Sequence, residues 1–399
     1  MKKAFLCLLA LAIVFLASCS RNEEKGGAET IVIWHDKEDG VIEVLEEALD
    51  KIKDEVTVVF EKKASLTEAL KLVGNDPKAA PDMYFFAHDK IGVYAEMGII
   101  APITDFISEE EFSSFLPITL DAGLYKGKRY QLPLYYETLL FIYNKKYMKE
   151  SDIPSTTEEL YAYMEKKTKY GHYGFVEQHS TPYYAAGWLH AFGTDWIDGD
   201  GNPLLDDPRT TRALEYHRKF VALMPGETEY ATVNTLFSEG MAHSTIAGPW
   251  FIPTVVKKGI DVGFAPMPLV EETGERINPY CGVQGLHVLK TAESKKGAVT
   301  KVLGTLMDEE IQIKLALGTG CAPAGKECYS DPRIQGDALV NAMRETAESA
   351  VPMSNRPEMD VMFTVSSSLL TDVNMSGKDI ESSAKSAQKK ALELLEAMK

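Results

Sequence analysis

Residues 81–97 read PDMYFFAHDKIGVYAEM, an apolar run followed by charged residues and then by an amphipathic segment. The run at 81–86 has the composition of a buried strand, and the segment at 88–97 is expected to be a helix. The same order precedes it twice, with strands at 31–34 and 57–60 and helices at 41–52 and 65–73. This alternation is typical of an α/β fold with a mostly parallel, doubly wound sheet.

Capping residues predict where further helices begin, because their side chains accept hydrogen bonds from free N–H groups. They are Ser65 with Glu68, Thr156 with Glu159, and Asp207 before Pro208. The last helix is expected to begin at about Asp379.

The composition supports folded domains and excludes a nucleic-acid-binding surface. The chain has 399 residues, of which 45% are hydrophobic and 25% are charged, and its formal net charge is −17. A duplex nucleic acid needs a cationic surface, which this chain does not offer. No long linker divides the sequence after residue 29, so we expect two α/β lobes joined by short crossings.

The N-terminus has the features of a bacterial lipoprotein signal. A basic start is followed by an apolar stretch at 4–17 and by Leu16-Ala17-Ser18-Cys19, which resembles a lipidation site. We expect residues 1–18 to be a signal peptide, Cys19 to carry acyl chains, and residues 19–29 to be a tether. The protein would then be periplasmic or extracellular and anchored to a membrane. The alternative is an ordinary signal peptide with an incidental cysteine.

The other cysteines allow at most one disulfide. Cys7 lies in the signal segment, which leaves Cys281, Cys321 and Cys328 beside the lipidation site. Three thiols give three pairings, and the sequence does not choose between them.

The known catalytic and cofactor motifs give no match. There is no GxSxG, P-loop, HExxH or dinucleotide fingerprint, so we expect neither a cofactor nor a metal ion. The segment 198–202 (DGDGN) begins like a calcium loop, but Pro203 and Arg209 stand where Gly and Glu are needed. A hairpin turn is the preferred interpretation.

Charged and aromatic residues follow the expected strands. Asp36 and Lys37 follow the first strand, and Phe86, Asp89 and Lys90 follow the third. Ligands of open α/β sheets bind outside the carboxyl ends of strands. Charged groups can exchange hydrogen bonds with vicinal hydroxyls, and aromatic faces can cover the C–H side of a sugar ring. Taken singly, a strand-end Asp is more often a helix cap.

Two further candidates lie later in the chain. Glu137 follows Tyr135-Tyr136, and Trp250 follows a Gly-Pro turn. Trp250 on its own would be interpreted as a core residue.

Together, several blocks resemble the maltose-binding protein family, the sugar-specific extracellular solute-binding proteins of ABC importers. The blocks occur in the family's order over nearly the whole mature chain. They are IVIW at 31–34, the block at 81–104, YKGKRYQLP at 125–133, IYNKKYM at 142–148, FSEGMAHSTIAGPW at 237–250, VGFAPMPL at 262–269, DPRI at 331–334, and the segment at 352–363.

The resemblance implies two lobes with a ligand in the cleft between them. The first lobe would comprise 30–135 and 285–328, and the second 139–281 and 331–399. Hinge crossings would lie near 135–139, 281–285 and 328–331.

The resemblance also implies a set of ligand-binding residues. Polar contacts would come from Asp36, Lys37, Asp89, Lys90 and Glu137, and stacking rings from Phe86, Tyr183, Tyr230, Trp250 and Phe363. Among these, Tyr183, Tyr230 and Phe363 rest on the resemblance alone.

The chain also departs from the family's pattern. Phe86 and Phe363 stand where the family often has Trp. Lys90 stands where Arg is usual, so a compact ammonium replaces the planar guanidinium that can donate two parallel hydrogen bonds. Thr181 stands where a carboxylate is familiar and Ser367 where Arg is. Maltose, maltodextrin and trehalose are therefore all open as ligands.

The expected function is that of a monomeric, lipid-anchored protein that binds an α-glucoside oligosaccharide and delivers it to an ABC permease without catalysis. A first alternative is a secreted glycosidase with Asp89 and Glu137 as acid and nucleophile. A second alternative is a surface lipoprotein that scaffolds or adheres.

Overall fold

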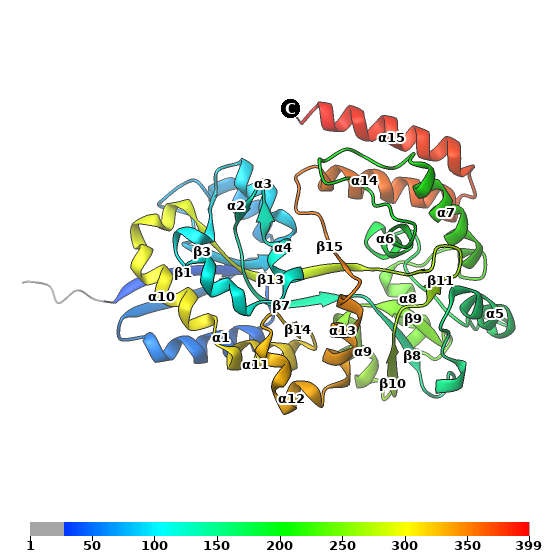
Figure 1. Cartoon of the computed structure of the whole chain (residues 1–399), viewed down its shortest axis with the longest axis horizontal. Helices are drawn as coiled ribbons and strands as arrows, with labels where there is room; N and C mark the ends of the chain where they lie inside the picture. Colours follow the sequence, from blue (N-terminus) through cyan, green and yellow to red (C-terminus); the bar gives the residue numbers. More distant parts are fainter. Residues whose placement is uncertain (1–27, 399) are drawn as a thin grey trace, which may run out of the picture.

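A computed structural model describes residues 28–398 and shows two α/β lobes side by side (Figure 1). Strands β7 and β13 run from one lobe toward the other across the middle of the molecule. The predicted α/β class is confirmed. The N-terminal signal, Cys7 and Cys19 lie outside the described residues.

The first lobe is built on a sheet with the strand order β14-β7-β13-β3-β1-β2, and the short strands β4 and β15 pair with β13. Strands β1 and β2, and β1 and β3, are parallel as predicted, but β13 is antiparallel to both β3 and β7. The sheet is therefore mixed. The strands are β1 (Glu29–His35), β2 (Val56–Lys62), β3 (Met83–Ala87), β4 (Ile100–Ala101), β7 (Leu132–Thr138), β13 (Tyr280–Leu289), β14 (Ala322–Pro323) and β15 (Val351–Pro352).

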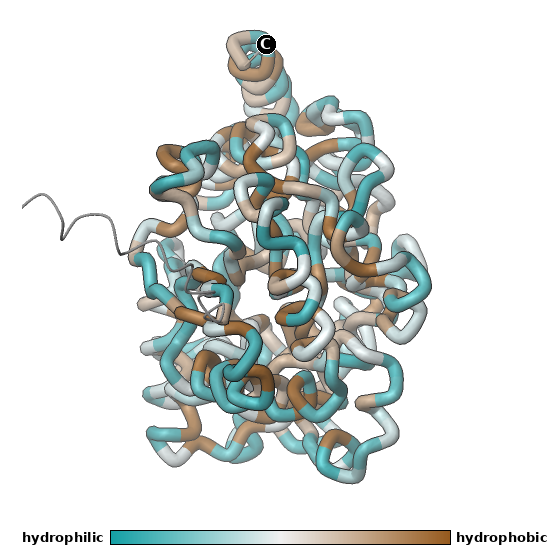
Figure 2. Tube along the Cα trace, turned by 90° about the vertical axis from the view of Figure 1, so that its left-hand side faces the viewer, coloured by the Kyte–Doolittle hydropathy of each residue, from teal (hydrophilic) through white to brown (hydrophobic). Residues whose placement is uncertain are grey.

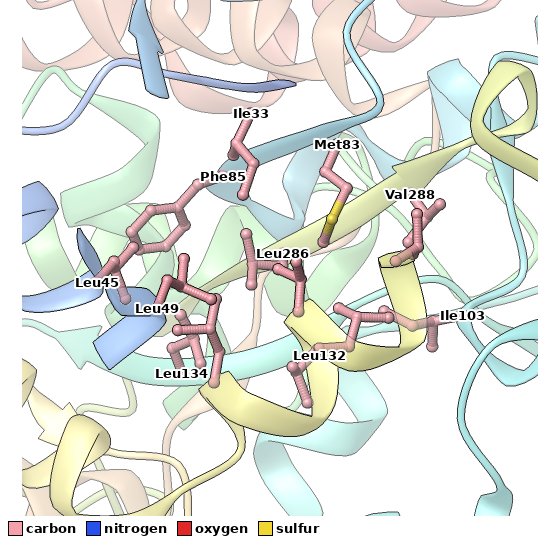
Figure 3. Close-up of a cluster of buried hydrophobic side chains, with 14 of the residues drawn as sticks. Ile33, Leu45, Leu49, Met83, Phe85, Ile103, Leu132, Leu134, Leu286 and Val288 are labelled. Atoms are coloured by element: carbon pink, nitrogen blue, oxygen red, sulfur yellow. The ribbon is translucent and has the colours of Figure 1, made fainter. Parts of the chain in front are cut away.

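Helices cover both faces of this sheet because apolar side chains of the strands alternate between the faces. On one face, α1 (Asp39–Leu49), α10 (Lys296–Leu306) and α11 (Glu309–Thr319) enclose a core that includes Leu45, Phe85 and Leu286 (Figure 3). On the other face, α2 (Leu66–Val73) and α3 (Ile91–Glu96) pack on a second apolar cluster.

The second lobe contains a three-stranded antiparallel sheet in the order β10-β8-β9. Helices α5, α6 and α7 contribute to the core on one side, and α8, α9 and α13 to that on the other. Helices α14 and α15 pack against α6 and α7. The elements are β8 (Leu140–Asn144), β9 (Ser244–Ala247), β10 (Val262–Ala265), α5 (Thr157–Lys167), α6 (Pro182–Ala191), α7 (Pro208–Val221), α8 (Tyr230–Ser238), α9 (Ile252–Lys257), α13 (Ala338–Ala347), α14 (Met359–Leu370) and α15 (Ile380–Glu396).

Shorter elements connect these layers. They include α4 (Pro117–Ala122), α12 (Pro332–Gln335), β5 (Leu124–Tyr125), β6 (Lys128–Arg129), β11 (Leu269–Val270), β12 (Glu275–Arg276) and the 3-10 helices η2 (His88–Lys90) and η6 (Pro249–Phe251).

The chain changes sheets abruptly where the lobes meet. Strand β7 ends at Thr138 and β8 begins at Leu140, so Leu139 alone separates strands of different sheets. On the returning path, Asn278 donates its N–H to Gly187 of α6, and three residues later Cys281 pairs with Thr138. The lobe and hinge boundaries given above stay a prediction.

Most of the local predictions agree with the structure, and one capping prediction is wrong. Thr156 and Asp207 accept hydrogen bonds from the first turns of α5 and α7, as predicted. The last helix, α15, begins directly after Asp379, whose side chain also accepts a capping hydrogen bond. Helix α2 begins after Ser65 as expected, but Ser65 makes no capping hydrogen bond. Its ψ of 58° lies outside the extended region that aims a capping oxygen at the helix.

The DGDGN segment is a turn, as predicted. Asp198 Oδ1 accepts hydrogen bonds from the N–H groups of Asp200 (2.9 Å) and Asn202 (2.8 Å). Ile197 and Pro203 form an antiparallel bridge at its base.

Cys281, Cys321 and Cys328 are free and buried, so no disulfide forms among them.

Hydrophobic and hydrophilic segments alternate along the described chain, without a long, uniformly apolar stretch (Figure 2). Accordingly, no helix between residues 28 and 398 has the length and apolarity needed to span a bilayer. Within the same residues, no group of His, Cys, Asp and Glu side chains is arranged to hold a metal ion.

Candidate functional site

The carboxyl ends of β1 and β3 bring the first group of predicted residues together. The two strands are parallel neighbours, with His35 in register with Phe85. Asp36 and Lys37 therefore follow β1 beside Phe86, near the end of β3. The Lys37 Nζ lies 5.2 Å from the centroid of the Phe86 ring and 2.8 Å from Asp36 Oδ1. Although it is charged, the Lys37 side chain is only 12% exposed.

Glu137 lies at the end of β7, opposite Gly282 of β13. Its Oε1 accepts a hydrogen bond of 3.0 Å from Gln284 Nε2, and its Oε2 is 3.7 Å from the Cys321 thiol. Burial raises the pKa of Glu137, while the hydrogen bond from Gln284 and the charge of Lys37 act in the opposite direction. Glu137 thus belongs to the same polar group as Lys37.

Asp89 and Lys90 form part of η2, directly after β3. Lys90 Nζ lies 3.4 Å from Asp89 Oδ2 and 2.5 Å from Oδ1 of Asp360, in the first turn of α14. Burial lowers the pKa of Lys90, but the charge of Asp89 and the hydrogen bond to Asp360 outweigh it and raise the pKa. The second lobe therefore reaches this group through Asp360.

Tyr183, near the start of α6, faces the same group from the second lobe. Burial raises the pKa of Tyr183, and the charges of Glu137 and Asp89 raise it further. Its ring lies 6.0 Å from that of Tyr184, in a T-shaped arrangement.

Tyr184 links Tyr183 to the two exposed aromatic candidates. Burial raises the pKa of Tyr184, and a hydrogen bond with Trp250 acts in the opposite direction; Tyr230 also lies close enough to influence it. Trp250 is 39% exposed and Tyr230 is 40% exposed, so both rings retain free surface. Trp250 is therefore not a core residue. Its position follows from β9, which ends at Ala247 and is followed by η6.

Phe363 lies on α14 and is partly buried against the same apolar cluster as Tyr183. Thr181 is also partly buried, directly before α6, and Ser367 occupies the third turn of α14. All three positions lie on or beside α6 and α14, helices that pack against each other.

The predicted residues thus lie in two groups, one around the ends of β1, β3 and β7 and one on α6, α8, η6 and α14, and the Lys90–Asp360 ion pair connects the first group to α14. Four residues of this arrangement were not predicted: Tyr184, Gln284, Cys321 and Asp360. Tyr184 could have been found as the second member of the Tyr183-Tyr184 pair. Gln284 lies on β13, Asp360 on α14 and Cys321 between α11 and β14, so their proximity depends on the tertiary fold.

This arrangement is suited to binding a neutral, hydroxyl-rich molecule. Carboxylates and ammonium groups accept from and donate to hydroxyls, and the rings offer apolar faces beside them.

Comparison with known proteins agrees with this geometry. The family model of bacterial extracellular solute-binding proteins matches residues 45–342. A maltotriose-binding protein of Pyrococcus abyssi is 31% identical over 86% of this chain and 77% of its own length. A galactooligosaccharide-binding protein of Bacillus subtilis is 27% identical over 93% of this chain and 92% of its own. A maltooligosaccharide ABC transporter solute-binding lipoprotein of Streptococcus pneumoniae is 24% identical over 84% of each chain.

A solved structure supports the same relationship. The crystal structure of a cyclo/maltodextrin-binding protein complexed with maltotetraose superposes with a TM-score of 0.85. The match covers 94% of this chain and 100% of the other, at 26% identity.

Replacing Glu137 with Gln should change the pH dependence of stability. Because the folded protein holds the Glu137 proton more tightly than the unfolded chain, this residue stabilises the fold at low pH. That contribution is lost as pH rises through the raised pKa. We expect Glu137→Gln to melt at a higher temperature than the wild type at pH 8, and the difference to vanish near pH 4.

Thermal unfolding across this pH range measures the effect. Glu110→Gln, at an exposed position, is the control and should show no such trend. A Glu137→Gln protein that melts lower at pH 8 would show that the ionised carboxylate stabilises the fold.

Proposed function

The chain belongs to the bacterial extracellular solute-binding proteins, and on this premise we propose that it binds a maltooligosaccharide between its lobes and delivers it to an ABC permease. The observation that supports this most directly is that the Lys90–Asp360 ion pair joins the strand-end charges of the first lobe to α14 of the second. In addition, Tyr183 of α6 lies close enough to Glu137 and Asp89 for their charges to raise its pKa.

Each part of the arrangement has a role in this proposal. The carboxylates of Asp36, Asp89 and Glu137 accept hydrogen bonds from sugar hydroxyls, and the ammonium groups of Lys37 and Lys90 donate to ring and hydroxyl oxygens. The rings of Phe86, Tyr183, Tyr230, Trp250 and Phe363 cover the C–H faces of successive glucosyl units.

The choice of a maltooligosaccharide rests on the relatives. The P. abyssi relative has the highest identity of those compared, and the S. pneumoniae relative also takes its name from a maltooligosaccharide. The B. subtilis relative, which is named for a galactooligosaccharide, supports a different sugar of the same class. Trehalose and maltose also belong in any test because the chain differs from the family at Lys90, Thr181 and Ser367.

We propose a mechanism of lobe closure without chemistry. Sugar binds first to one lobe and then bridges to the other, which shifts an open–closed equilibrium toward the closed form that the permease recognises. Rotation occurs at the crossings near 135–139, 281–285 and 328–331, which separate lobe 1 (30–135 and 285–328) from lobe 2 (139–281 and 331–399).

The proposed site does not favour a glycosidase. Glu137 is engaged by Gln284 and Cys321, and Asp89 Oδ2 lies 3.4 Å from the Lys90 ammonium, so neighbouring side chains already hold both carboxylates. The relatives compared are named as binding proteins, which fits a chain that releases its sugar unchanged.

Titration with a panel of sugars tests the function. We expect maltotriose to bind with a dissociation constant of about 1 μM, and maltose, trehalose, sucrose and a galactooligosaccharide to bind more weakly. Tryptophan fluorescence and calorimetry measure binding, and chromatography of the recovered sugar checks that it is intact. Hydrolysis of the recovered sugar would support the glycosidase alternative. Unchanged fluorescence and no heat of binding with every sugar would support a scaffolding lipoprotein.

Replacing Trp250 with Ala should weaken maltotriose binding about fivefold, because an aromatic anchor contributes roughly 1 kcal/mol. Calorimetry is the suitable measurement since the substitution removes a fluorescent reporter. Tyr170→Ala is the matched control, because Tyr170 is 97% exposed and has not been placed at the site. If the Trp250→Ala and wild-type proteins bind maltotriose equally well, the Trp250 ring has a structural role and does not contact the sugar.

Replacing Cys19 with Ala should release the protein from membranes. We propose that acyl chains on Cys19 anchor the mature chain, because such chains bury methylene groups in the bilayer. Expression of the full chain in a bacterial host, followed by separation of membrane and soluble fractions, measures the effect. Cys7→Ala should stay in the membrane fraction. A Cys19→Ala protein that also stays there would contradict the anchor.

A further inference from the structure

The Lys90 ammonium lies between two carboxylates that belong to different lobes. Asp89 is its neighbour in the chain, whereas Asp360 is 270 residues further on and accepts a hydrogen bond of 2.5 Å from Lys90. Asp360 lies in the first turn of α14, which packs on α6 and α15 of the second lobe. No sequence motif distinguishes this residue.

Two ordinary explanations account for an acidic residue at this position. A carboxylate in the first turn of a helix is favoured by the helix dipole. Surface ion pairs also form readily and contribute little to stability. Asp372 with Lys378, at 2.8 Å within the second lobe, is a pair of this kind. The Asp360 pair differs because its partner lies at the carboxyl end of β3 in the first lobe.

The Lys90–Asp360 pair matters for ligand binding because the Lys90 ammonium has several N–H donors. An ammonium has three N–H donors. Asp360 accepts a hydrogen bond from Lys90 and Asp89 lies 3.4 Å away as an ion pair, so the ammonium retains donor capacity for a ligand. The Lys90 side chain is 22% exposed, so solvent or a ligand can reach it. Where arginine has a rigid planar fork, a lysine head rotates freely unless neighbouring groups fix it.

We propose that Asp360 is a positioning residue of the sugar site, which holds the Lys90 ammonium from the opposite lobe and thereby couples lobe closure to ligand binding. This inference rests on the proposed function. The pair spans the lobes, so lobe opening that separates η2 from α14 breaks it. Its interaction free energy therefore favours the closed form, and its removal accelerates release of the sugar.

Calorimetric titration of maltotriose into Asp360→Asn tests the proposal. We expect the affinity to fall about threefold, as for a partly exposed ion pair, and the loss to shrink in about 0.5 M NaCl. In a Lys90→Met background the same substitution should cause no further loss, since no ammonium remains to be positioned. Asp360→Glu should restore part of the affinity. Asp372→Asn is the matched control and should bind like the wild type.

Two outcomes would overturn the proposal. One is equal affinity of Asp360→Asn and the wild type, and the other is a loss that persists in full in the Lys90→Met background. The second outcome would assign Asp360 to helix stability alone.

A measurement without sugar separates this inference from the proposed function. Acylation of Lys90 by an amine-reactive ester, followed by mass spectrometry, should be faster in Asp360→Asn than in the wild type, because the carboxylate holds the amine protonated and enclosed. An unchanged labelling rate would refute the pairing. If the wild type binds no sugar while labelling responds as expected, the proposed function fails and the pairing remains.

Discussion

Backbone pairing in the centre of the molecule fixes the two strands, β7 and β13, that run from one lobe toward the other. Strand β13 is buried along its whole length and pairs with β3 on one side and with β7 on the other. Breaking these ladders would leave buried N–H and C=O groups without partners, which is costly. Most of the proposed crossings 135–139 and 281–285 lies within the β7–β13 ladder, so rotation there would twist the two paired strands together and leave their hydrogen bonds in place. The chain changes sheets just beyond this ladder, at Leu139 and near Asn278.

The sequence predicts those parts of the fold that local patterns determine. Strands β1, β2 and β3 and the helices between them follow from short apolar runs and helical periodicity. The antiparallel placement of β13 could not be predicted, because strand order depends on contacts between residues far apart in the chain. The capping hydrogen bond predicted at Ser65 is absent for a different reason. The spacing of a capping box does not fix the backbone angles of its first residue.

The same distinction applies to the site. Asp36, Lys37, Phe86, Asp89 and Lys90 could be proposed together because parallel strands present their carboxyl ends at one edge. Gln284, Cys321 and Asp360 reach this edge only through tertiary packing. No local sequence pattern marks Tyr183, Tyr230 or Phe363 as ligand-binding residues. Only the resemblance to a known family predicts that role for them. Their placement on the second lobe follows from α6, α8 and α14.

The three free thiols affect how the protein tolerates an oxidising environment. Burial raises the pKa of Cys281 and Cys321, and raises that of Cys328 to about 12. Thiolate is the form that attacks disulfides and oxidants, and these enclosed groups remain protonated at neutral pH. Residues 28–398 therefore need no disulfide catalyst to reach the fold described. Reducing agents have no bond to break among these cysteines, so the domain should keep its fold equally well in oxidised and reduced surroundings.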